Sequence, residues 1–155
     1  MIKNLFVLFS LLLISSSCLF QKKAISTKNI KQGVAGKVFL VAGNQMPAPN
    51  APKPQPKPIS TTIYIYKLTN LSQVVRVNEA PVYRQIFTSF VDSVISNKEG
   101  FFYKALPVGN YSLFTKVNGM FYANAYDDKN NIQPVNVQKD SVAQITIQIS
   151  NNAVY

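Results

Sequence analysis

Short stretches in which apolar and polar residues alternate, each ended by turn-forming residues, recur along the chain from about residue 33 to residue 150. In the clearest stretch the apolar side chains share one face and the polar ones the other: Ala143, Ile145, Ile147 and Ile149 against Gln144, Thr146, Gln148 and Ser150. A period of two is the pattern of a β-strand with one buried and one exposed face. No stretch has the 3.6-residue period of an amphipathic helix, so the chain has to build its core from stacked sheets.

The predicted strands are short and follow one another closely: 33–42, 62–68, 86–95, 101–106, 110–117, 120–126, 132–137 and 142–149. The turn Asn97–Gly100 predicts a hairpin. Residues 71–85 fit no single pattern and are expected to form a loop with a short helix or strand. Such spacing predicts one all-β domain over residues 33–155, an antiparallel Greek-key β-sandwich of about seven strands.

A proline-rich run interrupts the strand pattern, since six of the twelve residues from Pro47 to Pro58 are proline. Proline has no backbone N–H to donate and fixes φ, so this run cannot enter a helix or a sheet interior. It is predicted as an exposed polyproline-II connector. The alternative is a ligand for a groove of the SH3 type.

The segment before the domain has the layout of a targeting signal. Met1–Asn4 carries one positive charge, Leu5–Ile14 is apolar, and three serines precede Cys18. About ten helical residues are too short to span a bilayer, so residues 1–17 are predicted to be a cleaved signal peptide.

The cleavage region, Ile14-Ser15-Ser16-Ser17-Cys18, resembles the lipobox of bacterial lipoproteins, with Ser15 at the position where that family prefers Leu, Ile or Val. The resemblance implies that Cys18 becomes the first mature residue and carries acyl chains that anchor the protein in the cell envelope. Residues 18–32, polar and basic, would then be a flexible tether. Leu19 is not the aspartate that retains enteric lipoproteins at the inner membrane, which favours the outer membrane. Ordinary secretion with an incidental cysteine is the alternative.

A turn in the second half of the domain suggests a structural role for two residues. In Leu106-Pro107-Val108-Gly109-Asn110-Tyr111, Gly109 permits a tight turn. The hydroxyl of Tyr111 can then donate back to upstream backbone, as in a tyrosine corner. A buried tyrosine without that bond is the alternative.

These residues also carry a family resemblance. Ser96 to Phe102, then Leu106 to Leu113, together with the opening Gly33 to Val38, are similar to the carboxypeptidase regulatory-like family. The resemblance covers about residues 33–150 and implies a transthyretin-like Greek-key sandwich. Its motifs describe turns and core positions, so it implies no catalytic residues.

Composition excludes most catalytic chemistry. The chain has no His, one Cys and six scattered carboxylates, so no catalytic residues, metal site or cofactor are expected. No Gly-rich phosphate loop or nucleophile elbow occurs. The net charge of +10 suits anionic partners, but the export signal argues against nucleic acid.

Tyr64 and Tyr66 lie on the strand face opposite Ile63 and Ile65, where they either pack or stack on a ligand. The sequence therefore predicts a lipid-anchored, non-catalytic structural or protein-interaction module with an envelope protein as partner. A carbohydrate- or peptide-binding module is the alternative. A concave aromatic patch at a loop end would favour ligand binding, and an exposed sheet edge or flat apolar face would favour assembly.

Overall fold

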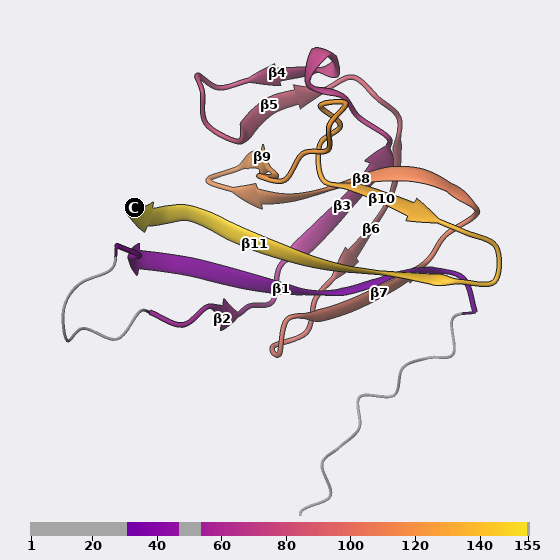
Figure 1. Cartoon of the computed structure of the whole chain (residues 1–155), viewed down its shortest axis with the longest axis horizontal. Coiled ribbons are helices and arrows are strands. Elements are labelled where there is room, and N and C mark those ends of the chain that lie inside the picture. Colours follow the sequence, from indigo (N-terminus) through magenta and orange to yellow (C-terminus); the bar gives the residue numbers. More distant parts are fainter. Residues whose placement is uncertain (1–30, 47–53, 155) are drawn as a thin grey trace, which may run out of the picture.

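The computed structural model describes residues 31–46 and 54–154. Its regular elements there are eleven strands and one short 3₁₀ helix, η1: β1 (Gly33–Asn44), β2 (Lys57–Pro58), β3 (Thr62–Lys67), η1 (Leu71–Gln73), β4 (Val74–Arg76), β5 (Val82–Ile86), β6 (Phe90–Ile95), β7 (Phe101–Ala105), β8 (Gly109–Val117), β9 (Met120–Tyr122), β10 (Pro134–Val137) and β11 (Val142–Val154). The strands form a four-stranded and a seven-stranded sheet with an apolar core between them (Figure 1). The predicted all-β sandwich is confirmed.

Sheet I is the four-stranded sheet, with β1 at its centre. β11 pairs with β1 in parallel along most of its length, beginning with Gly33 opposite Val142, and the two strands lie side by side in Figure 1. On its other side β1 pairs antiparallel with β7 and β2. The close approach of β1 to β11 and to the ring of Phe102 depends on Gly36. A Cβ there would lie 2.1 Å from the carbonyl oxygen of Ile145 and 3.0 Å from that ring.

Sheet II is the seven-stranded sheet, with the order β4-β5-β9-β8-β3-β6 and β10 beside β8. β8 pairs with β10 over its first half and with β9 over its last residues. The turn into β9 is Asn118-Gly119, in which both residues have positive φ, 51° and 79°. That geometry belongs to a two-residue hairpin turn and brings β9 directly back alongside β8.

The core lies between the two sheets. β3 contributes Ile63 and Ile65, and β11 contributes Ile147 and Ile149, all at most 3% exposed. The alternation in the sequence predicted Ile147 and Ile149 as inward positions, which is confirmed, and placed Ile63 and Ile65 on one face, which the structure shows to be the inner one. Full burial of one such side chain contributes about 1.5–3 kcal/mol, so this layer is the main source of stability. Its other buried members are Val34, Val38, Phe102, Leu106, Tyr111, Leu113, Tyr122, Val135 and Val137.

A second apolar cluster lies on the outer face of sheet II. The residues from η1 to the end of β5, 71–86, are called the flap here, and they pack against that face. Tyr83 of the flap and Phe114 of β8 are both fully buried. Because β5 also pairs with β9, the sheet curls back over its own outer side. The flap therefore covers this face of sheet II.

The prediction of a hairpin at Asn97–Gly100 is wrong. The turn forms, with the N–H of Gly100 donating to the carbonyl of Asn97 at 2.9 Å. However, β6 before it pairs with β3 in sheet II, whereas β7 after it pairs with β1 in sheet I. The buried hydroxyl of Ser96 donates to the carbonyl of Ile59 at 2.9 Å and ties the end of β6 to the chain entering β3. The turn therefore crosses between the sheets.

The strand predicted over 86–95 is shorter than expected. β5 ends at Ile86 in the flap, and β6 begins at Phe90 beside β3. The hydroxyls of Thr88 and Thr69 lie 2.6 Å apart and hold the connection between them. The strand count exceeds the prediction because the structure adds β2, β4 and β5, and the strand predicted over 120–126 ends at Tyr122 as β9.

Two details of β11 differ from the prediction. Its pairing with β1 is parallel, in a sandwich expected to be antiparallel throughout. Ser150, predicted to face outward, instead accepts a hydrogen bond from Asn124 at 3.0 Å and donates its N–H to the hydroxyl of Tyr122 at 3.1 Å. The register shifts between Leu40 and Ala42, and such a bulge interrupts the alternation of faces.

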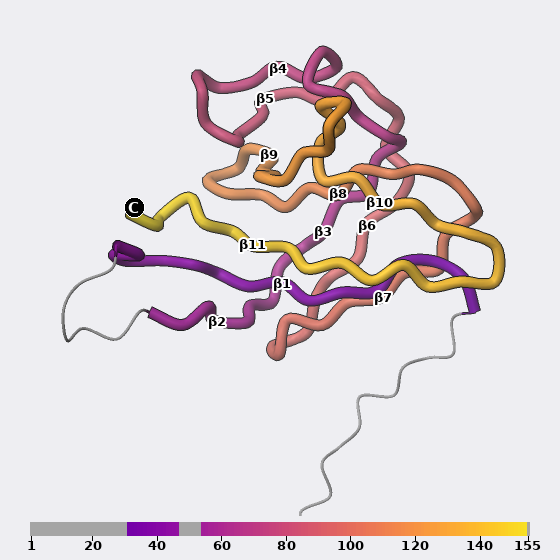
Figure 2. The backbone as a smooth tube through the Cα atoms, viewed as in Figure 1, coloured from indigo at the N-terminus to yellow at the C-terminus, as the bar shows by residue number. Residues whose placement is uncertain are grey.

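The proline-rich connector is described only from residue 54 onward. Pro54–Pro56 are exposed and outside any strand, and Lys57–Pro58 form β2, opposite Leu40 and Phe39 of β1. β2 is an edge strand, a sheet position that tolerates proline. Figure 2 follows the chain from β1 to β11 and shows that the described chain starts and finishes in sheet I.

Candidate functional site

Cys18, the predicted site of lipid attachment, lies outside the described residues, as do residues 1–17 and nearly all of the predicted tether 18–32. Within residues 31–46 and 54–154, no helix is long and apolar enough to span a membrane. The signal peptide and the lipid anchor therefore stay predictions.

The predicted corner residues lie together at the start of β8. The hydroxyl of Tyr111 donates to the carbonyl of Pro107 at 3.0 Å, which is the hydrogen bond that a tyrosine corner requires. Gly109 has a φ of 156°, and a Cβ there would lie 3.3 Å from the Tyr111 hydroxyl. Glycine thus gives the ring room to fold back over the turn.

Tyr64 and Tyr66, the predicted ligand-stacking residues, are part of the cluster under the flap. The ring of Tyr64 packs edge-on against Phe121, with centroids 5.6 Å apart. Tyr66 makes the same kind of contact with Phe90, Phe114 and Phe121 at 5.5–5.7 Å. Burial, with a smaller contribution from Tyr64, raises the pKa of the Tyr66 hydroxyl. These contacts give both rings packing partners within the protein.

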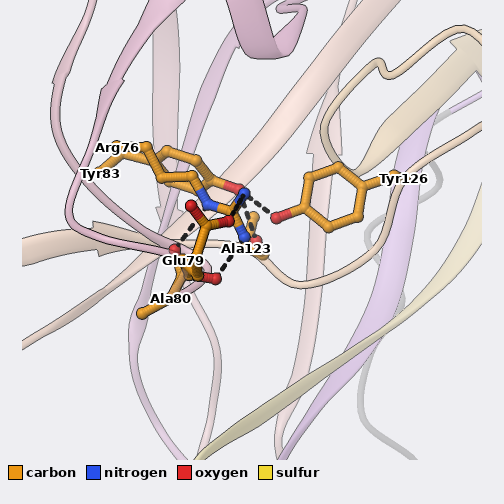
Figure 3. Close-up of polar contacts among 6 residues, drawn as sticks. All are labelled: Arg76, Glu79, Ala80, Tyr83, Ala123 and Tyr126. Carbon is orange, nitrogen blue, oxygen red and sulfur yellow. Dashed lines mark hydrogen bonds and ion pairs between the residues drawn. The ribbon is translucent and has the colours of Figure 1, made fainter.

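The flap is held by a tyrosine pair and by its own turn. The hydroxyl of Tyr83 donates to the carbonyl of Ala123 at 3.1 Å and lies 2.5 Å from the hydroxyl of Tyr126. Figure 3 shows the two hydroxyls pointing toward each other, with Arg76 folded onto the backbone of residues 79 and 80. Burial, and then the bond with Tyr126, raise the pKa of the Tyr83 hydroxyl. This tyrosine therefore stays protonated and fastens the flap to the end of β9.

The outer face of sheet I has no such cover within the described chain. Residues paired across neighbouring strands share a face, so the register places three rows of outward side chains next to one another. They are Tyr103, Ala35 and Gln144, then Phe101, Lys37 and Thr146, then Phe39 and Gln148. We call these eight residues the open face. A groove of about 620 Å³ runs over the first two rows, with the small side chain of Ala35 on its floor.

The open face offers polar groups without partners. In the part of the chain that the structure describes, the side chains of Gln144, Thr146 and Tyr103 make no hydrogen bond, and Gln144 and Thr146 are exposed. The ammonium of Lys37 makes no ion pair there and lies 4.6 Å from the ring centroid of Phe101 and 5.0 Å from that of Phe39. No Asp or Glu stands among the eight residues. The face thus combines aromatic surface, hydrogen-bonding groups and one cation.

Two carboxylates of the domain serve the structure. Asp92 of β6 accepts from Lys104 of β7 at 2.6 Å, and this bond lowers the pKa of the Asp92 carboxyl. Asp127 accepts from the side chain of Asn131 and from two backbone N–H groups, and these bonds lower its pKa in the same way. No cluster of three or more metal-ligating side chains occurs in residues 31–46 and 54–154.

The sequence analysis missed the open face. The alternation of Ala35, Lys37 and Phe39 and of Phe101 and Tyr103 was available as a signal that these side chains share a face. What the pattern lacked was the pairing of β7 with β1, since the turn at Asn97–Gly100 predicted β6 as the partner of β7. A concave aromatic patch at a loop end was the feature expected to indicate ligand binding. The structure has such a patch, but it lies on a sheet face.

The chain matches no protein-family model, no curated protein and no solved structure. The resemblances to bacterial lipoprotein signals and to carboxypeptidase regulatory-like domains therefore stay predictions.

Proposed function

We propose that the protein is a lipid-anchored, non-catalytic binding module of a bacterial envelope, with the outer membrane favoured, and that it binds its partner through the open face. Cys18 carries the lipid in this proposal, and residues 18–32 hold the domain away from the bilayer. The domain is taken to be a relative of the carboxypeptidase regulatory-like sandwiches.

The observation that carries the proposal is the difference between the outer faces of the two sheets. On sheet II the flap buries Phe114, and the exposed ring of Phe90 packs against Tyr66, whereas sheet I leaves Phe101 44% exposed beside unpaired polar side chains. An aromatic patch next to free donors and acceptors is typical of binding surfaces. The non-catalytic part of the proposal is supported by carboxylates that are already engaged in structural hydrogen bonds.

A second candidate function is assembly through the edge of sheet I. β11 is thirteen residues long, and within the described chain only β1 pairs with it. A long unpaired edge is a template for adding a strand from another chain. The open face is preferred over this edge as the binding surface because it carries the groove and the unpaired side chains.

The lipid anchor is tested by Cys18→Ala. We expect the wild-type protein to incorporate labelled fatty acid and to fractionate with envelopes, and the variant to remain as precursor or become soluble. Equal labelling of both proteins would refute the anchor.

The binding surface is tested by placing a photo-crosslinking amino acid in the full chain in envelopes. We expect adducts from Thr146 on the open face and none from Gln85, an exposed residue of the flap. Adducts of equal yield from both positions would contradict the proposal. A self-adduct from Asn151 alone, near the end of β11, would favour assembly through the edge.

A further inference from the structure

We infer that the ligand of the open face is an acidic polysaccharide, bound with one sugar ring in the groove and its carboxylate beside Lys37. This inference rests on the proposed function, because it names the ligand class of the same surface.

The groove has the chemistry that a sugar ring needs. A pyranose has apolar C–H faces and hydroxyls around its rim. Tyr103 and Phe101 supply aromatic surface on one side of Ala35, and Gln144 and Thr146 supply an amide and a hydroxyl on the other. Aromatic rings bind apolar faces of ligands, while the amide and hydroxyl have donors and acceptors left over for a polar rim.

Charge complementarity selects an acidic sugar. Lys37 stands in the middle row of the open face, and its ammonium contacts only the rings of Phe39 and Phe101 among the described residues. A cation over a ring is weakly held at an exposed site, whereas a carboxylate makes a charge-assisted hydrogen bond with the same ammonium. With no acidic side chain among the eight residues, the ligand has to bring the negative charge.

Two other anionic partners fit the face less well. An anionic bilayer is recognised by clusters of about four to eight Lys or Arg, and the open face has Lys37 alone. A single sugar ring also fits into a groove better than a flat surface of lipid headgroups does. An extended acidic peptide pairs with a sheet edge, and the open face presents side chains in place of free backbone groups.

The experiment measures binding of the full-length lipidated chain, in detergent micelles, to polygalacturonate, alginate and hyaluronate, with methyl-esterified polygalacturonate as the uncharged counterpart. We expect binding to at least one acidic polymer and at least tenfold weaker binding to the ester. Lys37→Gln should weaken binding by about tenfold or more, and Phe101→Ala by about fivefold to tenfold.

Matched controls come from the rest of the molecule. Lys116 also lies over two rings, 5.0 Å from that of Tyr64 and 4.9 Å from that of Phe121, but on sheet II. Lys116→Gln removes the same charge and should leave binding unchanged. Phe87→Ala removes an exposed ring, 61% accessible, from the loop after β5 and should also have no effect. Gln144→Ala, at an exposed position, should weaken binding without affecting the fold.

Each remaining outcome overturns the inference. Equal losses for Lys37→Gln and Lys116→Gln would show attraction by net charge alone, and no binding to any of the three acidic polymers would exclude the ligand class. Binding to phosphatidylglycerol vesicles that depends on Lys37, without glycan binding, would replace the sugar with a lipid. If glycan binding fails while Thr146 still gives its selective adduct, the proposed function holds and only the ligand class is wrong.

Discussion

The outer faces of the two sheets use the same kinds of side chain for different purposes. Each has phenylalanine and tyrosine in outward positions and a lysine ammonium within about 5 Å of two ring centroids. On sheet II the flap covers the rings, and Phe114 is fully buried among Tyr66, Tyr83 and Phe121. On sheet I Phe101 is exposed, and Tyr103 and Phe39 are partly exposed.

The difference shows that aromatic content in a strand does not by itself indicate a binding site. Tyr64 and Tyr66 looked like stacking residues in the sequence, yet they are packing residues because rings of β8 and β9, far along the chain, lie against them. Phe101 and Tyr103 are the surface residues because nothing in the described chain covers β7. The two faces differ in whether other parts of the chain pack over their aromatic residues, and not in composition.

The largest effect is expected from removing a ring on either outer face. Phe114→Ala removes a fully buried ring and should lower the free energy of unfolding by about 3–5 kcal/mol. Phe101→Ala removes a ring that is 44% exposed and should lower the free energy of unfolding by well under half as much. Urea unfolding of the full chain in detergent measures both. Similar losses for the two variants would mean that the open face is also a structural layer.

Removing the hydroxyl of Tyr83 should have a smaller effect, confined to the flap. Tyr83→Phe leaves the carbonyl of Ala123 without its donor and should cost about 1–3 kcal/mol. The loss should be local, so hydrogen exchange should speed up at the amides of β5 and stay unchanged in β1. Tyr111→Phe is the control, because that ring lies between the sheets and its hydroxyl bonds to Pro107. Uniformly faster exchange in Tyr83→Phe would show that the flap does not open separately.

The smallest effect is expected where the sheets meet at β6 and β7. The pKa of Asp92 is lowered by Lys104, so its carboxylate stabilises the fold above the unfolded-state pKa, and that contribution is lost as pH falls through the lower folded-state pKa. Asp92→Asn should cost less than about 1 kcal/mol at pH 7, because the pair is partly exposed and screened. The difference from wild type should vanish in acid.

Local patterns predicted the elements of this fold well. Strand alternation identified Ile147 and Ile149 as core residues and placed Ile63 and Ile65 together on one face, because each strand has one face toward the other sheet. The pattern could not assign partners, since a turn such as Asn97–Gly100 forms equally well within a sheet or between two. The curl that places residues 71–86 over sheet II depends on the pairing of β5 with β9, which no local signal records.

The candidate site was less predictable for the same reason. Gly109 and Tyr111 were found because a corner is local, with its bond spanning four residues. The open face was missed because it joins β1, β7 and β11, and only the register brings Lys37 beside Phe101 and Thr146. The packing of Tyr64 and Tyr66 likewise depends on residues distant in the sequence, Phe114 and Phe121.

The parallel pairing of β1 with β11 also affects how the chain folds. Gly33 finds its partner at Val142, more than one hundred residues later, so the contact order of sheet I is high and its formation should be slow. A chain that emerges from a ribosome or a translocon N-terminus first has β1 available long before β11. Until the last strand arrives, one edge of β1 remains open to pairing with other chains, which makes this interval the period of greatest aggregation risk.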